Sequence, residues 1–337
     1  MRITPVPDIS ESKKQTTLGF ASILLLCGCQ GVQSSLDAKG PHAAVIADIG
    51  WAMFGGATAI LLLVMALAAY AIWRVPEKRA ALPANMLIAA GGIALPVVTL
   101  SALLAYGVYA MAGLRIAPEA SPVRIEVTGH RWWWEVHYRA NDGTTITTAN
   151  EIHIPAGKPV TVFLRSADVI HSFWVPSLAG KIDLVPGRTN HIVLQADRPG
   201  VFRGQCAEYC GAQHARMAFH VVAQTPADFA SWLDRQAAPA RAPADDIALR
   251  GQSAFSAHCA SCHTVRGLST ARERGPDLSH VGSRQFLAAG TLPNTAASLA
   301  DFIARSQSIK PGNGMPSHAH LGEETVAAIA RYLEGLE

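Results

Sequence analysis

Two long stretches of the sequence contain no charged side chain: residues 49–73 and 86–114. A helix needs about 20 apolar residues to cross the hydrocarbon core of a bilayer, and both stretches exceed that length. We therefore predict a transmembrane hairpin within residues 29–115, with helices over about 45–73 and 86–114. Pro96 lies inside the second of these helices, where it is tolerated and is expected to cause a kink.

The connection between the two predicted helices carries Arg74, Lys78 and Arg79. The positive-inside rule places a short basic loop of this kind in the cytoplasm. Residues after Arg115 are therefore expected on the other side, in the periplasm of a bacterial cell with an inner membrane. The formal net charge of +3 is spread without basic blocks, so nucleic acid is not an expected partner.

Residues 1–28 are typical of a signal peptide. Lys13 and Lys14 precede the apolar run LGFASILLLCGC, which is too short to span a bilayer. The end of this run, residues 26–29, resembles a bacterial lipobox, in which the last cysteine is lipidated after cleavage. Cys29 would then begin a lipid-anchored mature chain, and an ordinary signal peptide with incidental cysteines is the alternative.

Residues 116–225 change to short β-rich runs. The runs VRIEVTG, KPVTVFLR, RTNHIVLQA and MAFHVVA are separated by Gly, Pro, Asn and Asp, a pattern typical of a small β-sandwich or barrel. Two predicted strands, GVFRGQ and MAFHVV, flank the segment CAEYCGAQHARM, residues 206–217. A loop held between two strands can present metal ligands in a fixed arrangement.

This loop and one upstream histidine offer a set of metal ligands. The donors are the thiols of Cys206 and Cys210, the imidazoles of His214 and His171, and the thioether of Met217. We expect His171, in DVIHSFWVP, to lie in a turn. Zinc would be satisfied by two thiolates and two imidazoles, whereas copper also uses a weak thioether, so the set favours copper. A Cys206–Cys210 disulfide and a packing role for Met217 are the alternatives.

Residues 226–245 are predicted to form a helix followed by an Ala- and Pro-rich linker. The motif CASCH then provides Cys259, Cys262 and His263, the spacing at which haem is attached by two thioether bonds and its iron is bound by histidine. Met315, in the loop GNGMPSH, is suited to be the sixth iron ligand.

Other interpretations of the same motifs remain. His318 or His320 could replace Met315 at the iron, and the CxxC pair could belong to a thioredoxin-like or zinc site. His258 and His280 are expected to be surface or core residues.

The motifs HSFWVP, KIDLVPGR and CAEYCGAQHARM follow two predicted membrane helices and precede the haem motif. In this order they resemble subunit II of a caa-type cytochrome c oxidase, in which a CuA cupredoxin domain is fused to a class I cytochrome c domain. The resemblance to subunit II covers roughly residues 45–222. It implies a multidomain fold: a two-helix transmembrane hairpin, an all-β cupredoxin-like Greek-key sandwich and, over residues 246–337, an all-α cytochrome c domain.

The resemblance also implies a function. Electrons would come from a soluble or membrane cytochrome c, or another donor, to the chain's own haem c. They would pass through binuclear CuA to the haem of subunit I, which reduces O2 to water coupled to proton translocation; subunits I and III would be the partners. The implied CuA ligands are the side chains of His171, Cys206, Cys210, His214 and Met217 and the backbone carbonyl of Glu208, whose carboxylate would reach a magnesium ion at the subunit I boundary.

The run GHRWWWEVHY is similar to the family's aromatic strand, whose first tryptophan, here Trp132, is the point of electron entry to CuA; packing is an equal alternative. On a strand, Trp132 and Trp134 would share one face and Trp133 the other, and we expect Trp133 and Trp134 to pack. Further residues that are expected to contact subunit I or to be solvated are Asp168, Lys181, Asp183 and Arg188.

One departure from the family concerns the start of the second membrane helix. The stretch NMLIAAGGIALP contains no acidic residue, so the family's proton entry route is not carried over. Two other assignments are a CuA-containing subunit of a nitric oxide reductase and a membrane-anchored copper-binding protein, the latter leaving the haem motif without a role. A quinol oxidase subunit is disfavoured because all the copper ligands are present.

Overall fold

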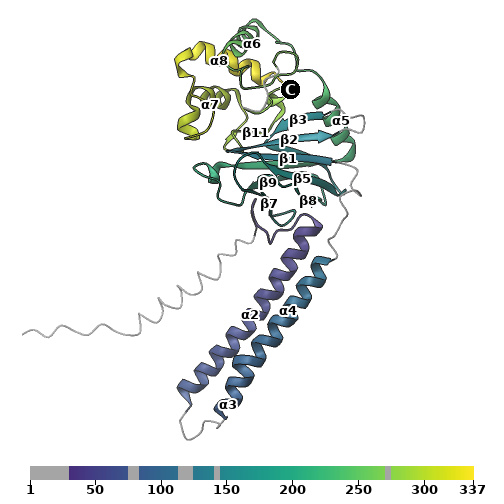
Figure 1. Cartoon of the computed structure of the whole chain (residues 1–337), viewed down its shortest axis with the longest axis vertical. Coiled ribbons are helices and arrows are strands. Elements are labelled where there is room, and N and C mark those ends of the chain that lie inside the picture. Colours follow the sequence, from purple (N-terminus) through teal and green to yellow (C-terminus); the bar gives the residue numbers. More distant parts are fainter. Residues whose placement is uncertain (1–29, 75–82, 113–123, 140–144, 270–274) are drawn as a thin grey trace, which may run out of the picture.

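The computed structural model describes residues 30–74, 83–112, 124–139, 145–269 and 275–337. The predicted signal peptide lies outside the described residues, as do Cys27, Cys29, Lys78, Arg79 and Arg115. Figure 1 shows two long helices side by side below a β-sandwich, with a helical domain on the opposite side of the sandwich.

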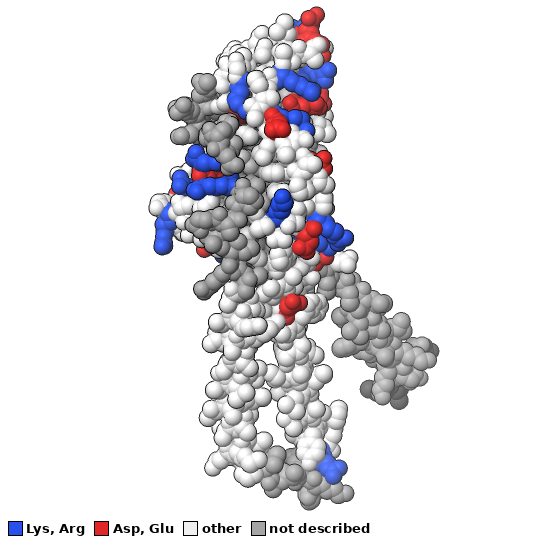
Figure 2. Space-filling model, turned by 90° about the vertical axis from the view of Figure 1, so that its right-hand side faces the viewer, with Lys and Arg blue, Asp and Glu red and all other residues white. Residues whose placement is uncertain are grey.

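The two long helices confirm the predicted hairpin. Helix α2 spans Pro41–Trp73, and the second helix runs over Ala84–Ala112, with a mean hydropathy of 2.2 in each. Most of their apolar side chains are exposed beyond the start of α2, where Ala43 and Ala47 are buried. On the face drawn in Figure 2 most Lys, Arg, Asp and Glu residues lie on the outer domains instead. A hairpin with this surface anchors the protein in a membrane.

The second helix is divided by a wider turn before its proline. It consists of α3 (Ala84–Leu87), a π-helical segment η2 (Ile88–Ala94) and α4 (Leu95–Ala112). Pro96 has no backbone N–H and its ring crowds the preceding turn, so the helix widens just before it. The expected kink at Pro96 stays a prediction.

Two five-stranded sheets form the sandwich, which confirms the predicted all-β domain. The first sheet has the order β3-β2-β1-β5-β8: Thr145–Ala149, Trp133–Arg139, Arg124–His130, Val160–Ser166 and Asn190–Leu194. The second has the order β4-β10-β9-β6-β7: Glu151–Pro155, Ala218–Gln224, Gly200–Cys206, His171–Trp174 and Ile182–Leu184.

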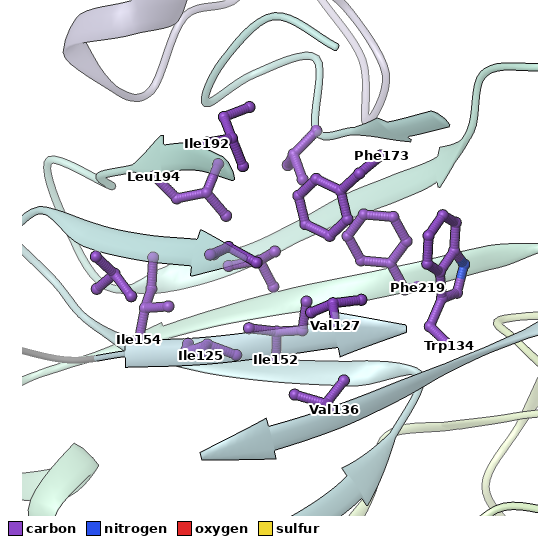
Figure 3. Packing of buried hydrophobic residues seen from close by; sticks show 14 of the residues in the cluster. Ile125, Val127, Trp134, Val136, Ile152, Ile154, Phe173, Ile192, Leu194 and Phe219 are labelled. Carbon is purple, nitrogen blue, oxygen red and sulfur yellow. The ribbon is translucent and has the colours of Figure 1, made fainter. Parts of the chain in front are cut away.

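The core lies between these sheets. Buried and less buried residues alternate along β1, as expected for a strand with one face against a core. Trp134 from the first sheet is fully buried and packs against Phe173 and Phe219 from the second, with ring centroids 5.9 and 5.1 Å away. Figure 3 shows this group at one end of the core, and it supports the strands that carry the metal ligands.

Helix α5 (Pro226–Ala237) packs on the sandwich and is a part of it. Thr225 caps its start by accepting a hydrogen bond from the Asp228 backbone N–H. Phe229 and Trp232 are buried in the sandwich core, and the Trp232 ring stacks on His153 at 4.0 Å between centroids. The connection to the next domain is therefore limited to residues 238–245.

Three helices enclose a second core and confirm the predicted all-α domain. They are α6 (Asp246–His258), α7 (Ala296–Ile309) and α8 (Glu323–Glu334), with a two-stranded ribbon of β11 (Phe286–Leu287) and β12 (Leu292–Pro293). Helices α6 and α8 cross closely at Gly251, where an added Cβ would lie 2.0 Å from the Ala328 carbonyl oxygen. Glycine is therefore required at this crossing.

Candidate metal and haem sites

The predicted copper loop joins the adjacent strands β9 and β10. Cys206 is the last residue of β9, and its N–H donates a hydrogen bond of 2.9 Å to the carbonyl of Met217, which immediately precedes β10. The loop also contains a 3₁₀ turn, η4, over His214–Arg216. The sheet therefore holds both ends of the loop.

His171 reaches this loop from a neighbouring strand. The prediction that it lies in a turn is wrong: it is the first residue of β6. Strand β6 pairs with β9, with Phe173 opposite Cys206. Residues 35 apart in sequence are thus brought together by the sheet, with 3.8 Å between His171 Nδ1 and Cys206 Sγ.

The predicted copper ligands lie around the two cysteine sulfurs. The Sγ atoms of Cys206 and Cys210 are 3.7 Å apart, whereas a disulfide bond measures about 2.05 Å, and both cysteines are free. The alternative of a disulfide is therefore not supported. The remaining contacts are Cys210 Sγ to His214 Nδ1 at 3.8 Å, Cys210 Sγ to Met217 Sδ at 3.8 Å and Cys206 Sγ to the Glu208 carbonyl oxygen at 3.2 Å.

The pKa values of the two thiols shift in opposite directions. The hydrogen bond with Cys210 lowers the pKa of Cys206, and the nearby His171 lowers it further. The same hydrogen bond raises the pKa of Cys210, because this thiol would have to ionise beside a thiolate. A bound cation would favour the thiolate form of both cysteines.

The donor set fits copper. His171, Cys206, Cys210 and Met217 are each no more than 4% exposed, and the ligand atoms of the first three lie within 4.8 Å of one another. Each thiol has its own imidazole neighbour, which suits two metal ions bridged by two thiolates. Soft sulfur donors with imidazole select copper over hard cations.

Asp168 orients His171. Its Oδ1 lies 2.7 Å from His171 Nε2, and its Oδ2 accepts a 2.7 Å hydrogen bond from the Arg131 backbone N–H. The carboxylate thus holds the Nε2 edge of the ring and leaves Nδ1 facing Cys206, a common arrangement around metal-binding histidines. The sequence suggested only that Asp168 contacts a partner or solvent, and the DxxH spacing from Asp168 to His171 was the available signal for this contact.

We expect the Asp168→Asn variant to bind copper about 10- to 100-fold more weakly, because the amide carries no charge to hold the imidazole. The measurement is a copper titration of the full chain in detergent against a competing chelator. Asp197→Asn changes an exposed aspartate of the same sandwich and serves as the control. Equal copper affinity in the two variants would contradict an orienting role for Asp168.

The other predicted partner-facing residues are exposed. Lys181 Nζ lies 3.0 Å from Asp183 and 3.9 Å from the Glu208 carboxylate, and Arg188 lies in the turn after β7. Their contact with another subunit stays a prediction.

The haem motif follows directly on helix α6. Cys259 is the residue that caps the end of this helix. The N–H groups of Cys262 and His263 both donate 3.0 Å hydrogen bonds to the Cys259 carbonyl. His263 Nδ1 lies 2.9 Å from the Pro276 carbonyl oxygen, to which it can only donate, so Nε2 is left as the free acceptor. Burial lowers the pKa of His263, which favours the neutral imidazole that binds iron.

Cys259, Cys262, His263 and Met315 border one cavity of about 540 Å³, within the usual size of cofactor sites. The Met315 loop is fixed by hydrogen bonds: its N–H donates to Asn313 Oδ1 (2.7 Å), and its carbonyl accepts from Ser306 and Gln307 (2.8 and 2.7 Å). The residues therefore fit a covalently attached haem. His318 also lines the cavity.

The histidines outside the motif divide as follows. His280 is buried, with its ring nitrogens 3.0 Å from the Glu337 carbonyl and 3.1 Å from that of Ala238, so it is a core residue. His258 is exposed at the end of α6 and reaches the cavity edge.

Trp132 is placed differently from the prediction. It is not on β2 but in the turn between β1 and β2, because His130 pairs directly with Trp133. Its Nε1–H donates a 2.9 Å hydrogen bond to the carbonyl of Cys210, and its ring lines the haem cavity. Trp132 thus touches both candidate sites.

The other two tryptophans occupy opposite faces of β2. Trp134 is a core residue, as expected. Trp133 stacks on His130 with 4.4 Å between ring centroids and also borders the cavity beside the haem motif.

The helical domain contacts the sandwich directly, which the sequence did not predict. Gln285 N–H donates to the Glu151 carboxylate (2.9 Å), and Ala218 N–H donates to the Ala289 carbonyl (3.0 Å). The rings of His220 and Phe286 stack at 3.9 Å. These contacts fix the haem cavity beside the copper loop.

Comparison with known proteins gives two family matches in the same order. Residues 139–224 match the family model described as cytochrome c oxidase subunit II, periplasmic domain, and residues 248–337 match the cytochrome c model.

Two relatives and one solved structure illustrate the similarity. Cytochrome c oxidase subunit 2 of Alkalihalophilus pseudofirmus is 34% identical over 336 residues, covering 93% of this chain and 94% of that protein. The subunit 2 of Bacillus sp. strain PS3 is 32% identical, covering 65% of this chain and 64% of that protein, slightly less than two thirds. The crystal structure of the periplasmic domain of subunit II of cytochrome oxidase from Bradyrhizobium japonicum is 32% identical, covers 35% of this chain and 95% of that chain, and has a TM-score of 0.33.

Proposed function

Since this chain belongs to the family of cytochrome c oxidase subunit 2 and carries a cytochrome c domain, we propose that electrons cross it from its helical domain to its copper loop. Cys259, Cys262, His263 and Met315 would hold a haem c, and the loop with His171 would hold binuclear CuA. When bound, these groups supply one-electron redox centres, and the electrons continue to the haem of subunit I, where O2 is reduced to water.

The observation that carries this proposal is the position of Trp132. Its ring lines the haem cavity, and its indole N–H is hydrogen-bonded to the backbone of Cys210. One side chain and one hydrogen bond therefore connect the wall of the cavity to a copper ligand. This contact supports the role of Trp132 in electron entry and gives the cytochrome c domain a function that a copper-delivery protein would not need.

The loop is suited to moving electrons with little rearrangement. Four of its proposed ligands, His171, Cys206, Cys210 and Met217, are buried, and His214 is half-buried. Two strands, the Asp168 carboxylate and the backbone bond between Cys206 and Met217 hold the loop in place. The thioether of Met217 is a weak ligand that tunes a copper site without fixing its geometry. A rigid set of ligands disfavours large changes in ligand geometry between the oxidised and reduced states.

The membrane hairpin supports the proposed location and partners. We place both outer domains in the periplasm at a bacterial inner membrane, with subunits I and III against the exposed apolar helices. The exposed Glu208 carboxylate would bind magnesium at the boundary with subunit I, and a soluble or membrane cytochrome c would donate electrons at the haem c domain. Relatives named cytochrome c oxidase favour O2 over nitric oxide as the substrate of the complex.

The test is flash reduction of the haem c in the anaerobic full chain, loaded with haem and copper. We expect reoxidation of the haem to match reduction of a mixed-valence binuclear copper centre, at a rate independent of protein concentration. Trp132→Leu is expected to slow this step severalfold while both spectra persist. Trp51→Leu, in the membrane helix, is the matched control.

A concentration-dependent rate, or the absence of a binuclear copper signal, would refute the proposed path. Oxygen uptake without nitric oxide uptake by the purified complex would identify its substrate.

A further inference from the structure

Lys310 lies at the end of helix α7, between the two outer domains. It is only 3% exposed, although a lysine is rarely buried without partners. Its Nζ donates hydrogen bonds to three backbone carbonyls: those of Trp132 at 2.9 Å, Arg216 at 3.1 Å and Ala288 at 3.1 Å. An ammonium group has three N–H donors and no acceptor, so this set uses all of them.

The three carbonyls come from both domains. Trp132 and Arg216 belong to the sandwich, and Ala288 belongs to the cytochrome c domain. Trp132 is hydrogen-bonded to Cys210, and Arg216 immediately precedes Met217. The Lys310 ammonium group therefore connects the cytochrome c domain to the proposed copper loop at two points: directly at Arg216, and through Trp132 at Cys210.

Two further hydrogen bonds join the copper loop to the residues on either side of Lys310. Gln213 Nε2 donates a 2.8 Å hydrogen bond to the Pro311 carbonyl, and the Arg216 guanidinium donates to the Ile309 carbonyl. A cation beside the last carbonyls of α7 is also favoured by the helix dipole. The end of α7 thus sits on the copper loop through residues 309–311.

The burial of Lys310 needs compensation. Desolvation, assisted by the nearby Arg216, lowers the pKa of Lys310, whereas three carbonyl acceptors favour the protonated form with its three N–H donors. All three acceptors are available only while the cytochrome c domain is docked, because Trp132 and Arg216 belong to the sandwich whereas Lys310 and Ala288 belong to the cytochrome c domain. Undocking would remove two of the three hydrogen bonds.

We propose that Lys310 is a positioning residue that locks the cytochrome c domain onto the copper loop and so keeps the haem cavity against Trp132. The inference rests on the proposed electron path for its effect on rate, whereas the docking itself is a property of the chain alone. Within the described part of the chain, Lys310 donates to backbone carbonyls and to no acidic side chain, so its role depends on donor geometry rather than on an ion pair.

The test compares Lys310→Met, which keeps the length but removes charge and donors, with Lys158→Met, an exposed lysine of the same chain. We expect the docked-to-undocked ratio to fall at least about tenfold, equivalent to about 1.4 kcal/mol. Hydrogen exchange at residues 285–293 and 309–315 measures docking directly. Intramolecular haem-to-copper transfer should slow and become dependent on solvent viscosity, because the domain must re-dock before each transfer.

Lys310→Gln is a second variant that keeps a shorter, neutral donor, and we expect smaller changes in the same measurements. Haem and copper spectra should match the wild type in both variants. Unchanged exchange and an unchanged, viscosity-independent rate in Lys310→Met would overturn the proposal, as would loss of the copper signal, which would assign Lys310 to the copper site itself. If the wild type shows no intramolecular transfer, the electron path fails, and hydrogen exchange still tests the docking role.

Discussion

The Cys206→Ser variant is expected to lose the mixed-valence binuclear copper signal and, with it, electron transfer out of the haem c. The Cys206 sulfur lies 3.7 Å from that of Cys210 and 3.8 Å from His171 Nδ1, so it would be a ligand of the proposed copper centre together with both residues. A serine hydroxyl is a harder and weaker copper ligand. Cys210 would then be the one thiolate left to hold the copper.

Electron paramagnetic resonance, copper content and flash reduction of the full chain measure this effect. Cys262→Ser is the reciprocal control: it removes a haem attachment point and should leave the two-copper signal intact. The Cys206→Ser haem spectrum should equal that of the wild type, because Cys206 does not line the haem cavity. Persistence of a two-copper signal in Cys206→Ser would contradict the assigned ligand set.

Features encoded locally in the sequence were predictable. Uncharged runs predicted the membrane helices because the bilayer imposes length and composition together. The proposed copper ligands in residues 206–217 could be grouped from the sequence because they lie on one loop between two recognisable strands. The haem motif could be predicted because covalent attachment needs particular residue types at short spacings, and the structure places it and Met315 around one cavity.

Features that depend on chain geometry were not predictable in the same way. Alternation through the run WWW placed Trp132 on a strand, but the pairing of His130 with Trp133 leaves Arg131 and Trp132 in the turn. The pattern of α5 suggested a helix before a linker, yet only the positions of His153 and Tyr138 explain why Trp232 is buried in the sandwich.

Docking of the two domains was the least predictable feature. Lys310 and Trp132 are 178 positions apart, and the lysine binds backbone carbonyls, which every residue possesses. No residue type at the acceptor positions is therefore required, and the sequence carries no pattern for this contact.

The Met315→Ala variant should lower the reduction potential of the haem c by tenths of a volt, within the range of about 0.8 V that axial ligands span. Met315 is the thioether that faces the same cavity as His263, and a His/Met pair raises the potential of a haem. A lower potential makes the haem harder for an external cytochrome c to reduce, whereas transfer to copper after flash reduction should persist. In this variant we therefore expect slower reduction of the haem by the external cytochrome c and unimpaired transfer from haem to copper.

Spectroelectrochemical titration of the full chain measures that shift, and Met217→Leu is the matched control. Met217 Sδ lies 3.8 Å from Cys210 Sγ, so its replacement should change the copper potential and spare the haem. An unchanged haem potential in Met315→Ala would refute Met315 as an iron ligand. The sixth position would then pass to another side chain of the cavity, whose lining includes the imidazoles of His318 and His258.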